Sequence, residues 1–182
     1  MKFENYFKNY NKSIFDLLND FDTSFIDKSV SLINNCKNNG GKVYIVGNGG
    51  SSSIASHVSV DFAKTTNVPS DTFNNSNLIT CFANDYGYEN WVSESIKSYT
   101  QINDMLILIS SSGTSKNIIN AAKYCKEKNI PLITLSGFKG DNPLSQLGNV
   151  NIHVHSDNYN FIEMSHHIIL LSIVDIFVQK LA

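Results

Sequence analysis

Five short runs rich in aliphatic and β-branched residues divide the stretch between residues 43 and 154, and the intervals between them are long enough for helices. The runs cover residues 43–46, 78–82, 105–110, 131–136 and 150–154. Four of these five runs are continuously apolar, which is typical of strands covered on both faces. Parallel strands need such long crossover connections. The pattern predicts an α/β fold, a doubly wound five-stranded parallel sheet flanked by helices.

Both ends of the chain show apolar residues at helical spacing. Residues 1–40 predict two helices, the second ended by the sequence NNGG at residues 38–41. Residues 158–182 predict a long C-terminal helix that is apolar almost all round between residues 168 and 178. We therefore expect one domain over residues 1–182, with its α/β core at residues 41–157. A helix that is apolar all round needs partners on every side, so we predict a homo-oligomer.

Charge and cysteine content exclude several classes of protein. The formal net charge is −2 and the chain contains no arginine. It therefore lacks both the positive field and the guanidinium groups of a nucleic-acid-binding protein. Its three cysteines form no CxxC pair, as expected of a reducing cytoplasm. The longest apolar-rich stretch has 11 residues, too short to cross a bilayer, so we expect a cytoplasmic protein without a membrane span.

Two loops that follow predicted strands carry the composition of a phosphate site. Residues 47–53 read GNGGSSS and residues 110–115 read SSSGTS, and each leads into a predicted helix. Glycines permit a close backbone approach, while hydroxyls and helix-start N–H groups bind anions. The alternative is a pair of ordinary turns with capping serines. A nucleotide cofactor is not expected, because Ser52 breaks the GxGxxG pattern and no GxxxxGK[ST] motif occurs.

Two pairs of ionisable residues stand one helical turn apart. His57 and Asp61 lie on the helix that follows the glycine loop, and Glu163 and His167 lie on the last helix. If oligomerisation brings these helices together, the four side chains can bind a divalent metal ion or act as acid and base. The alternative is a set of ordinary hydrogen bonds. Asp85, after the run at residues 78–82, lies in a segment suited either to contact ligand hydroxyls or to form a turn.

Four segments resemble the phosphoheptose isomerases of the sugar isomerase (SIS) domain superfamily. They read VYIVGNGGSSSIASHVSVDF, CFANDYGYEN, ISSSGTSKNIINAAKYCKEKNIPLITLSG and FIEMSHHI. The resemblance covers nearly the whole chain and implies a homotetramer with a helical core. It also implies the conversion of sedoheptulose 7-phosphate to D-glycero-D-manno-heptose 7-phosphate in the cytoplasm, for surface-polysaccharide synthesis.

The resemblance also implies roles for particular residues. A sugar-phosphate site is carried over to Asn48, Gly49, Gly50, Ser51, Asp85, Ser110, Ser111, Ser112 and Ser115. His57 matches a zinc ligand, and Asp61 stands where the family usually has a glutamate that is both ligand and base. Glu163 takes the place of a glutamine ligand.

The last helix departs from the family pattern. Leu171 stands where the family has a histidine that is both ligand and acid–base group. His167 precedes it by one turn and projects from the same side of the helix, about 6 Å nearer its start. We predict that His167 supplies the missing imidazole, with His166 as the alternative. The metal set would then be His57, Asp61, Glu163 and His167, with Asp61 and His167 catalytic.

Two other functions remain open, and a third is disfavoured. Some SIS-domain proteins have lost the catalytic residues and act as tetrameric binding or regulatory proteins, and Leu171 fits such a loss. Asp61 is one methylene shorter than glutamate, so an isomerase for a different sugar phosphate is also consistent with the sequence. A nucleotide-dependent dehydrogenase is disfavoured by the missing fingerprint.

An aldose–ketose isomerase needs a base over the C–H bond and a group that stabilises the enediolate oxygen.

Overall fold

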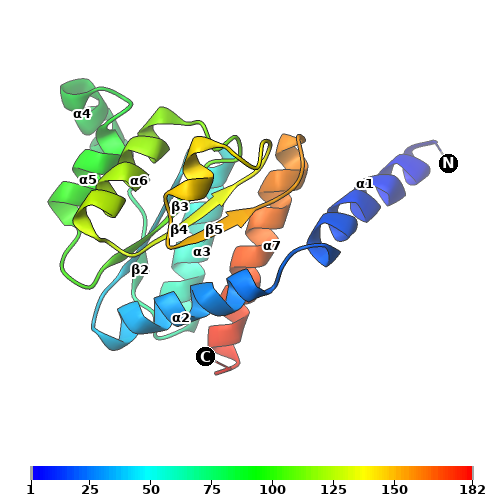
Figure 1. The fold of residues 1–182 in the computed structure, drawn as a ribbon, viewed down its shortest axis with the longest axis horizontal. Helices are drawn as coiled ribbons and strands as arrows, with labels where there is room; N and C mark the ends of the chain where they lie inside the picture. The colour runs from blue at the N-terminus through cyan, green and yellow to red at the C-terminus, as the bar shows by residue number, and fades with distance from the viewer. Residues whose placement is uncertain (1, 182) are drawn as a thin grey trace.

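A five-stranded parallel sheet forms the centre of the protein, in a computed structural model that describes residues 2–181 (Figure 1). The strand order is β2–β1–β3–β4–β5, and all four neighbouring pairs are parallel. The strands are β1 Val43–Gly47, β2 Ser70–Asp71, β3 Met105–Ile109, β4 Leu132–Ser136 and β5 Val150–His153. The predicted fold class, a five-stranded parallel α/β sheet, is confirmed.

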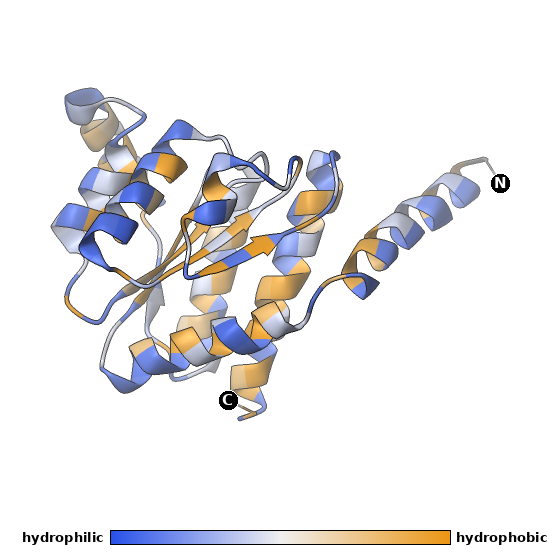
Figure 2. Cartoon of the chain, in the orientation of Figure 1, coloured by the Kyte–Doolittle hydropathy of each residue, from blue (hydrophilic) through white to orange (hydrophobic). Residues whose placement is uncertain are grey.

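Helices cover both faces of the sheet because its strands are apolar on both faces (Figure 2). In β1, Val43 and Ile45 belong to one apolar cluster, while Tyr44 and Val46 belong to the other. The first cluster packs under α2 Ser24–Asn38, α3 Gly50–Thr65 and α7 Tyr159–Val178. The second packs under α4 Ser76–Tyr86, α5 Trp91–Tyr99, α6 Lys116–Lys128 and the 3₁₀ turn η1 Pro143–Gln146.

The strand predicted at residues 78–82 is wrong, because this segment forms the middle of α4. Its apolar residues Leu78, Ile79, Phe82 and Ala83 lie on one side of a helix and pack against the second cluster. The side chain of Asn75 accepts hydrogen bonds from the N–H groups of residues 77 and 78 and caps this helix. The second strand of the sheet is instead the two-residue β2, which pairs with Val43 and Tyr44.

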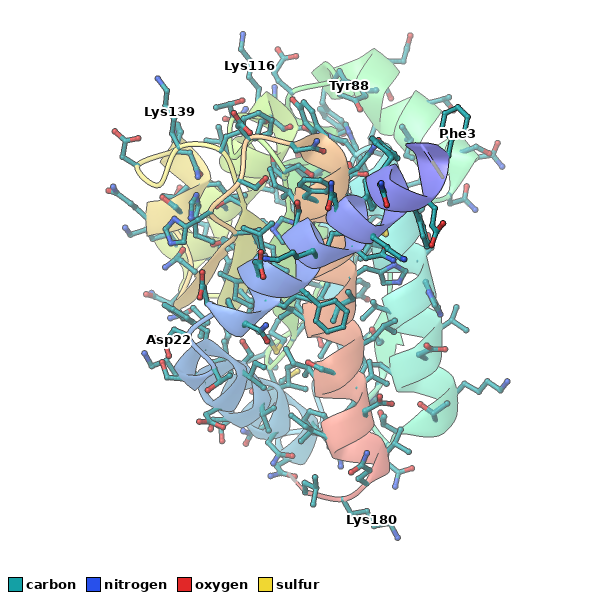
Figure 3. The ribbon with its side chains drawn as sticks, turned by 90° about the vertical axis from the view of Figure 1, so that its right-hand side faces the viewer. Phe3, Asp22, Tyr88, Lys116, Lys139 and Lys180 are labelled. Atoms are coloured by element: carbon teal, nitrogen blue, oxygen red, sulfur yellow. The ribbon has the colours of Figure 1, made fainter. Side chains whose placement is uncertain are left out.

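The predicted pair of N-terminal helices is present as α1 Lys2–Asn19 and α2. Residues 1 and 182, which end the ranges 1–40 and 158–182, lie outside the described residues. The first helix extends away from the sheet (Figure 1) and crosses α7, where the Tyr10 and Phe161 rings meet edge to face at 4.9 Å (Figure 3). Beyond that contact its aromatic side chains are open, with Phe3 83% exposed.

The last helix, α7, is long and apolar enough to cross a membrane by length and composition alone. Many core helices of globular proteins pass the same test. Here Ile162, Leu170 and Ile173 are fully buried in the first apolar cluster, whereas Ile168 and Val178 are each 45% exposed. The helix therefore packs on the sheet layer with one side and leaves the other uncovered.

Candidate functional site

The strand order places a crevice at the carboxyl ends of β1 and β3. The chain leaves β1 towards α3, on one face of the sheet, and leaves β3 towards α6, on the other face. Neighbouring strands whose connections run to opposite faces open the switch-point crevice in which α/β proteins bind ligands. Both polar loops singled out in the sequence therefore meet at one place.

A cavity of about 230 Å³ fills this crevice, and we call it the serine cavity. The hydroxyl groups of Ser51 and Ser111, from the two loops, lie 3.4 Å apart, and Ser110 donates to Ser115 at 3.0 Å. The cavity is lined by Asn48, Gly49, Gly50, Ser51, Ile109, Ser110, Ser111, Ser112, Ser115, Tyr159 and Glu163. Every residue carried over as phosphate-binding, Asp85 excepted, therefore lines one cavity.

The start of each neighbouring helix offers backbone donors to this cavity. Neither Gly49, before α3, nor Ser115, before α6, caps its helix with a side chain. The first N–H groups of a helix have no acceptor within the helix and attract anions. A tetrahedral oxyanion in the serine cavity would therefore find backbone N–H groups and serine hydroxyls together.

Two glycines shape the loops through close contacts. Gly113 has φ +65°, a left-handed conformation that disfavours side chains, and an added Cβ would overlap the Asn142 side chain. Gly50 packs directly under the Glu163 carboxylate, which a Cβ would also overlap. The absence of side chains at these two positions lets α7 and the η1 loop approach the cavity closely.

Asn117, on α6, fixes one wall of the cavity and was not identified from the sequence. Its side chain exchanges two hydrogen bonds with that of Asn48, each 2.9 Å long. Asn117 is 2% exposed. The hydroxyl of Tyr88 donates to the same Asn48 oxygen at 3.4 Å. Tyr159, in the first turn of α7, also lines the cavity and was missed.

A second polar group lies further along α3 and α7, which run side by side (Figure 3). His57 Nε2 is 3.2 Å from Asp61 Oδ2, and His57 Nδ1 is 2.9 Å from His167 Nε2. The side chains of His57 and Asp61 are 50% and 31% exposed. We call these three residues the histidine cluster. The packing of α3 against α7 thus brings His57 and Asp61 next to His167 within a single chain, without oligomerisation.

A hydrogen bond and a charge contact connect the histidine cluster. One hydrogen bond joins the two imidazole rings, and either ring nitrogen can be its donor, depending on the tautomer. The Asp61 carboxylate lies beside His57 Nε2. Burial and the neighbouring His57 lower the pKa of His167, and Asp61 opposes that shift. An imidazole whose pKa lies near or below neutral pH can both donate and accept a proton.

Glu163 stands apart from the histidine cluster. It precedes His167 by one turn on α7, yet its carboxylate lies in the serine cavity, where it accepts a hydrogen bond from Ser111 Oγ at 3.5 Å. The alternative residue His166 is fully buried and faces the backbone carbonyl of Ser136 at 3.1 Å. It is therefore not accessible for catalysis.

The residues present do not form the zinc site that the resemblance implies. Within residues 2–181, no group of three His, Cys, Asp or Glu side chains is placed to hold a metal ion. His57 and His167 direct ring nitrogens at each other, and Leu171 has no donor atom. Zinc binding is untested and stays an expectation from the resemblance alone, and no chemical step is assigned to zinc below.

Asp85 does not join either group. It lies in the last turn of α4, where Asn84 Nδ2 donates to it at 3.0 Å and Cys81 Sγ approaches it at 3.8 Å. It does not line the serine cavity. Because the segment before it is a helix and not a strand, its position differs from that expected of a loop at the edge of the sheet.

Comparison with known proteins agrees with this geometry. Residues 5–137 match the SIS domain family. The chain is 36% identical over 137 residues to the phosphoheptose isomerase of Aneurinibacillus thermoaerophilus, covering 72% of this chain and 69% of that protein. It is 32% identical over 157 residues to that of Campylobacter jejuni serotype O:6, covering 83% and 84%. A phosphoheptose isomerase structure from Francisella tularensis superposes with a TM-score of 0.86 at 26% identity, covering 98% and 97%.

Proposed function

The chain belongs to the SIS domain family, among the phosphoheptose isomerases, and we propose from this that it interconverts the ketose and aldose forms of a sugar phosphate. Its relatives are named phosphoheptose isomerases. The substrate pair that the resemblance implies is sedoheptulose 7-phosphate and its aldose isomer. The observation that carries the proposal is the serine cavity, where two helix starts and the serine hydroxyls surround one crevice. A phosphate group fits these donors.

The reaction moves one proton between two neighbouring carbons. A base removes a proton from C1 of the ketose while the C2 carbonyl oxygen gains one, which gives an enediol. Proton return to C2 and loss of the C1 hydroxyl proton then give the aldehyde. We assign the base to Asp61 and the acid at the carbonyl oxygen to His167, since both lie on the helices that border the cavity.

The proposed assembly is a homotetramer in the cytoplasm, as the resemblance implies. Its support is the apolar surface that the single chain leaves uncovered. On α1, Phe3, Phe7 and Phe15 are all more than 60% exposed, and Val60 and Ile168 flank the histidine cluster in sequence with 58% and 45% exposure. Exposed apolar surfaces of this kind mark interfaces between proteins.

The experiment is proton NMR in D₂O with purified protein and sedoheptulose 7-phosphate, with and without added zinc. An aldose anomeric signal and solvent deuterium at C2 are the expected results. If neither appears under either condition, the heptose assignment fails, and other sugar phosphates are tested next.

A second candidate is a non-catalytic sugar-phosphate-binding protein. The observation that favours it is Leu171, which packs against the first apolar cluster and contributes no donor to the histidine cluster. Such a protein would be stabilised by sugar phosphates yet exchange no deuterium. The same NMR sample, followed by a thermal melt, separates the two functions.

A further inference from the structure

The hydrogen bonds of the Asn48 side chain determine what it can offer to a ligand in the serine cavity. Its Oδ1 atom accepts from Asn117 Nδ2 at 2.9 Å and from the Tyr88 hydroxyl at 3.4 Å. A carbonyl oxygen has two lone pairs, so both acceptor sites of this amide are used. Its Nδ2 atom donates one of its two hydrogens to Asn117 Oδ1. Because Asn48 lines the cavity, it offers a ligand there its second N–H group.

The pairing with Asn117 does not by itself select this orientation. Two side-chain amides that exchange hydrogen bonds stay paired when both are turned over together, since each presents a donor and an acceptor to the other. The turned pair would direct a lone pair of Asn48 Oδ1, and not an N–H group, at the cavity. The Tyr88 hydroxyl breaks this symmetry, because its O–H group donates to the oxygen at its present place.

Tyr88 reaches Asn48 from the turn between α4 and α5, at the end of the molecule where α7 begins (Figure 3). Hydrogen bonds within the turn close it. Asn90 Nδ2 donates to the Tyr86 carbonyl at 2.9 Å, and the Asn90 N–H donates to the Gly87 carbonyl at 3.0 Å. The Tyr88 hydroxyl thus joins this turn to the loop after β1, 40 residues earlier in the chain.

We propose that Tyr88 is a positioning residue that fixes the Asn48 amide as a hydrogen-bond donor to the ligand of the serine cavity. The ligand atom that receives this hydrogen bond is an acceptor oxygen of the sugar phosphate. The inference rests on the proposed function only in taking this cavity as the sugar-phosphate site. Tyr88 acts through Asn48, so its hydroxyl should matter only while the Asn48 amide is present.

The first test needs no ligand. Tyr88→Phe removes the hydroxyl and keeps the ring, and Tyr86→Phe makes the same change at an exposed tyrosine that packs against Phe82 of its own helix. Proton–nitrogen NMR of protein labelled at asparagine reports the Asn48 Nδ2 signals, which Asn48→Ala identifies by removing them. In Tyr88→Phe these signals should double or broaden, because both amide orientations become populated. In Tyr86→Phe they should match the wild type.

The second test measures binding of inorganic phosphate by isothermal titration calorimetry at about pH 8, where phosphate offers strong acceptor oxygens. Tyr88→Phe should lower the affinity about two- to threefold, the lower end for one neutral hydrogen bond, because the bond to Asn48 is long. Tyr86→Phe should bind as the wild type does. In the Asn48→Ala background, Tyr88→Phe should have no further effect, since the two side chains act as a pair.

Two results would overturn the proposal. One is a set of Asn48 signals in Tyr88→Phe that keeps its wild-type number and line width. The other is an equal loss of phosphate affinity from Tyr88→Phe with and without Asn48, which would mean that Tyr88 acts on the ligand by another route.

These outcomes are separable from those of the proposed function. Doubled Asn48 signals in Tyr88→Phe without deuterium exchange from sedoheptulose 7-phosphate refute the heptose isomerase assignment alone. Deuterium exchange by the wild type, together with unchanged Asn48 signals in Tyr88→Phe, refutes the role of Tyr88 alone.

Discussion

Replacement of Asn117 by alanine tests whether the buried amide pair holds the serine cavity in shape. The substitution removes both 2.9 Å hydrogen bonds to Asn48 and leaves that side chain with one contact, the 3.4 Å hydrogen bond from Tyr88. Each neutral hydrogen bond contributes about 0.5–1.5 kcal/mol net. The higher helix propensity of alanine offsets roughly half a kcal/mol. We expect the free energy of unfolding to fall by about 1–2 kcal/mol.

The same change should weaken phosphate binding. In the variant, Asn48 must be ordered by the ligand, and ordering one side chain costs about 0.5–1.5 kcal/mol. Since about 1.4 kcal/mol corresponds to a factor of ten, affinity for inorganic phosphate should fall roughly two- to tenfold. Urea unfolding measures the first effect, and isothermal titration calorimetry measures the second.

Asn120→Ala is the matched control, because Asn120 lies one turn later on α6. Its side chain donates to the Glu89 carbonyl at 3.0 Å and to Asn90 Oδ1 at 3.1 Å, away from the cavity lining. This variant should lose stability and keep wild-type affinity. If both variants weaken phosphate binding equally, or if Asn117→Ala binds as the wild type does, the reasoning about Asn48 is refuted.

Three further predictions concern other parts of the chain. Gly113→Ala should destabilise the protein more than Gly40→Ala in urea unfolding, because both glycines have positive φ but only at Gly113 would a Cβ meet Asn142; equal losses would contradict this. His167→Ala should abolish deuterium exchange and leave phosphate affinity unchanged, since His167 does not line the serine cavity; undiminished turnover would reject its catalytic role. Burial lowers the pKa of His166 to about 4, whereas in the unfolded chain this imidazole takes up its proton near pH 6.5. The free energy of unfolding should therefore decline as the pH falls from about 6.5 to about 4, by up to roughly 3 kcal/mol. Urea unfolding should show a steeper decline of this free energy with falling pH for the wild type than for His166→Asn, and equal declines would contradict the prediction.

The sequence predicted the sheet where burial is complete. Strands such as β1 and β3 are buried on both faces, so a continuous apolar run identifies them without any partner information. The run at residues 78–82 is also rich in apolar residues, but it forms a helix that buries only one side. Over five residues, composition alone does not distinguish a buried strand from a helix of this kind. The two-residue strand β2, Ser70–Asp71, contains no apolar residue. It is recognised as a strand only through its pairing with β1, which the sequence does not show.

The candidate site was predictable to the extent that it depends on loops. Hydroxyls and glycines after a strand show in the sequence, and the strand order then brings the two loops together. Asn117 could not be identified in this way, because its partner Asn48 lies 69 residues away and a polar residue in the first turn of a helix has many ordinary reasons to be there. The contact between His57 and His167 likewise depends on how α3 and α7 pack.

None of the described residues that line the serine cavity is cationic, and this has a consequence for the effect of ionic strength. Anion sites built on lysine or arginine weaken as salt is added, because mobile ions screen the attraction. Here hydroxyl and amide groups supply the donors, and Glu163, which is charged and lines the cavity, repels a phosphate. Salt would screen that repulsion, so affinity for inorganic phosphate should stay level or rise with added sodium chloride. Binding of a small phosphate ester would then persist at high ionic strength.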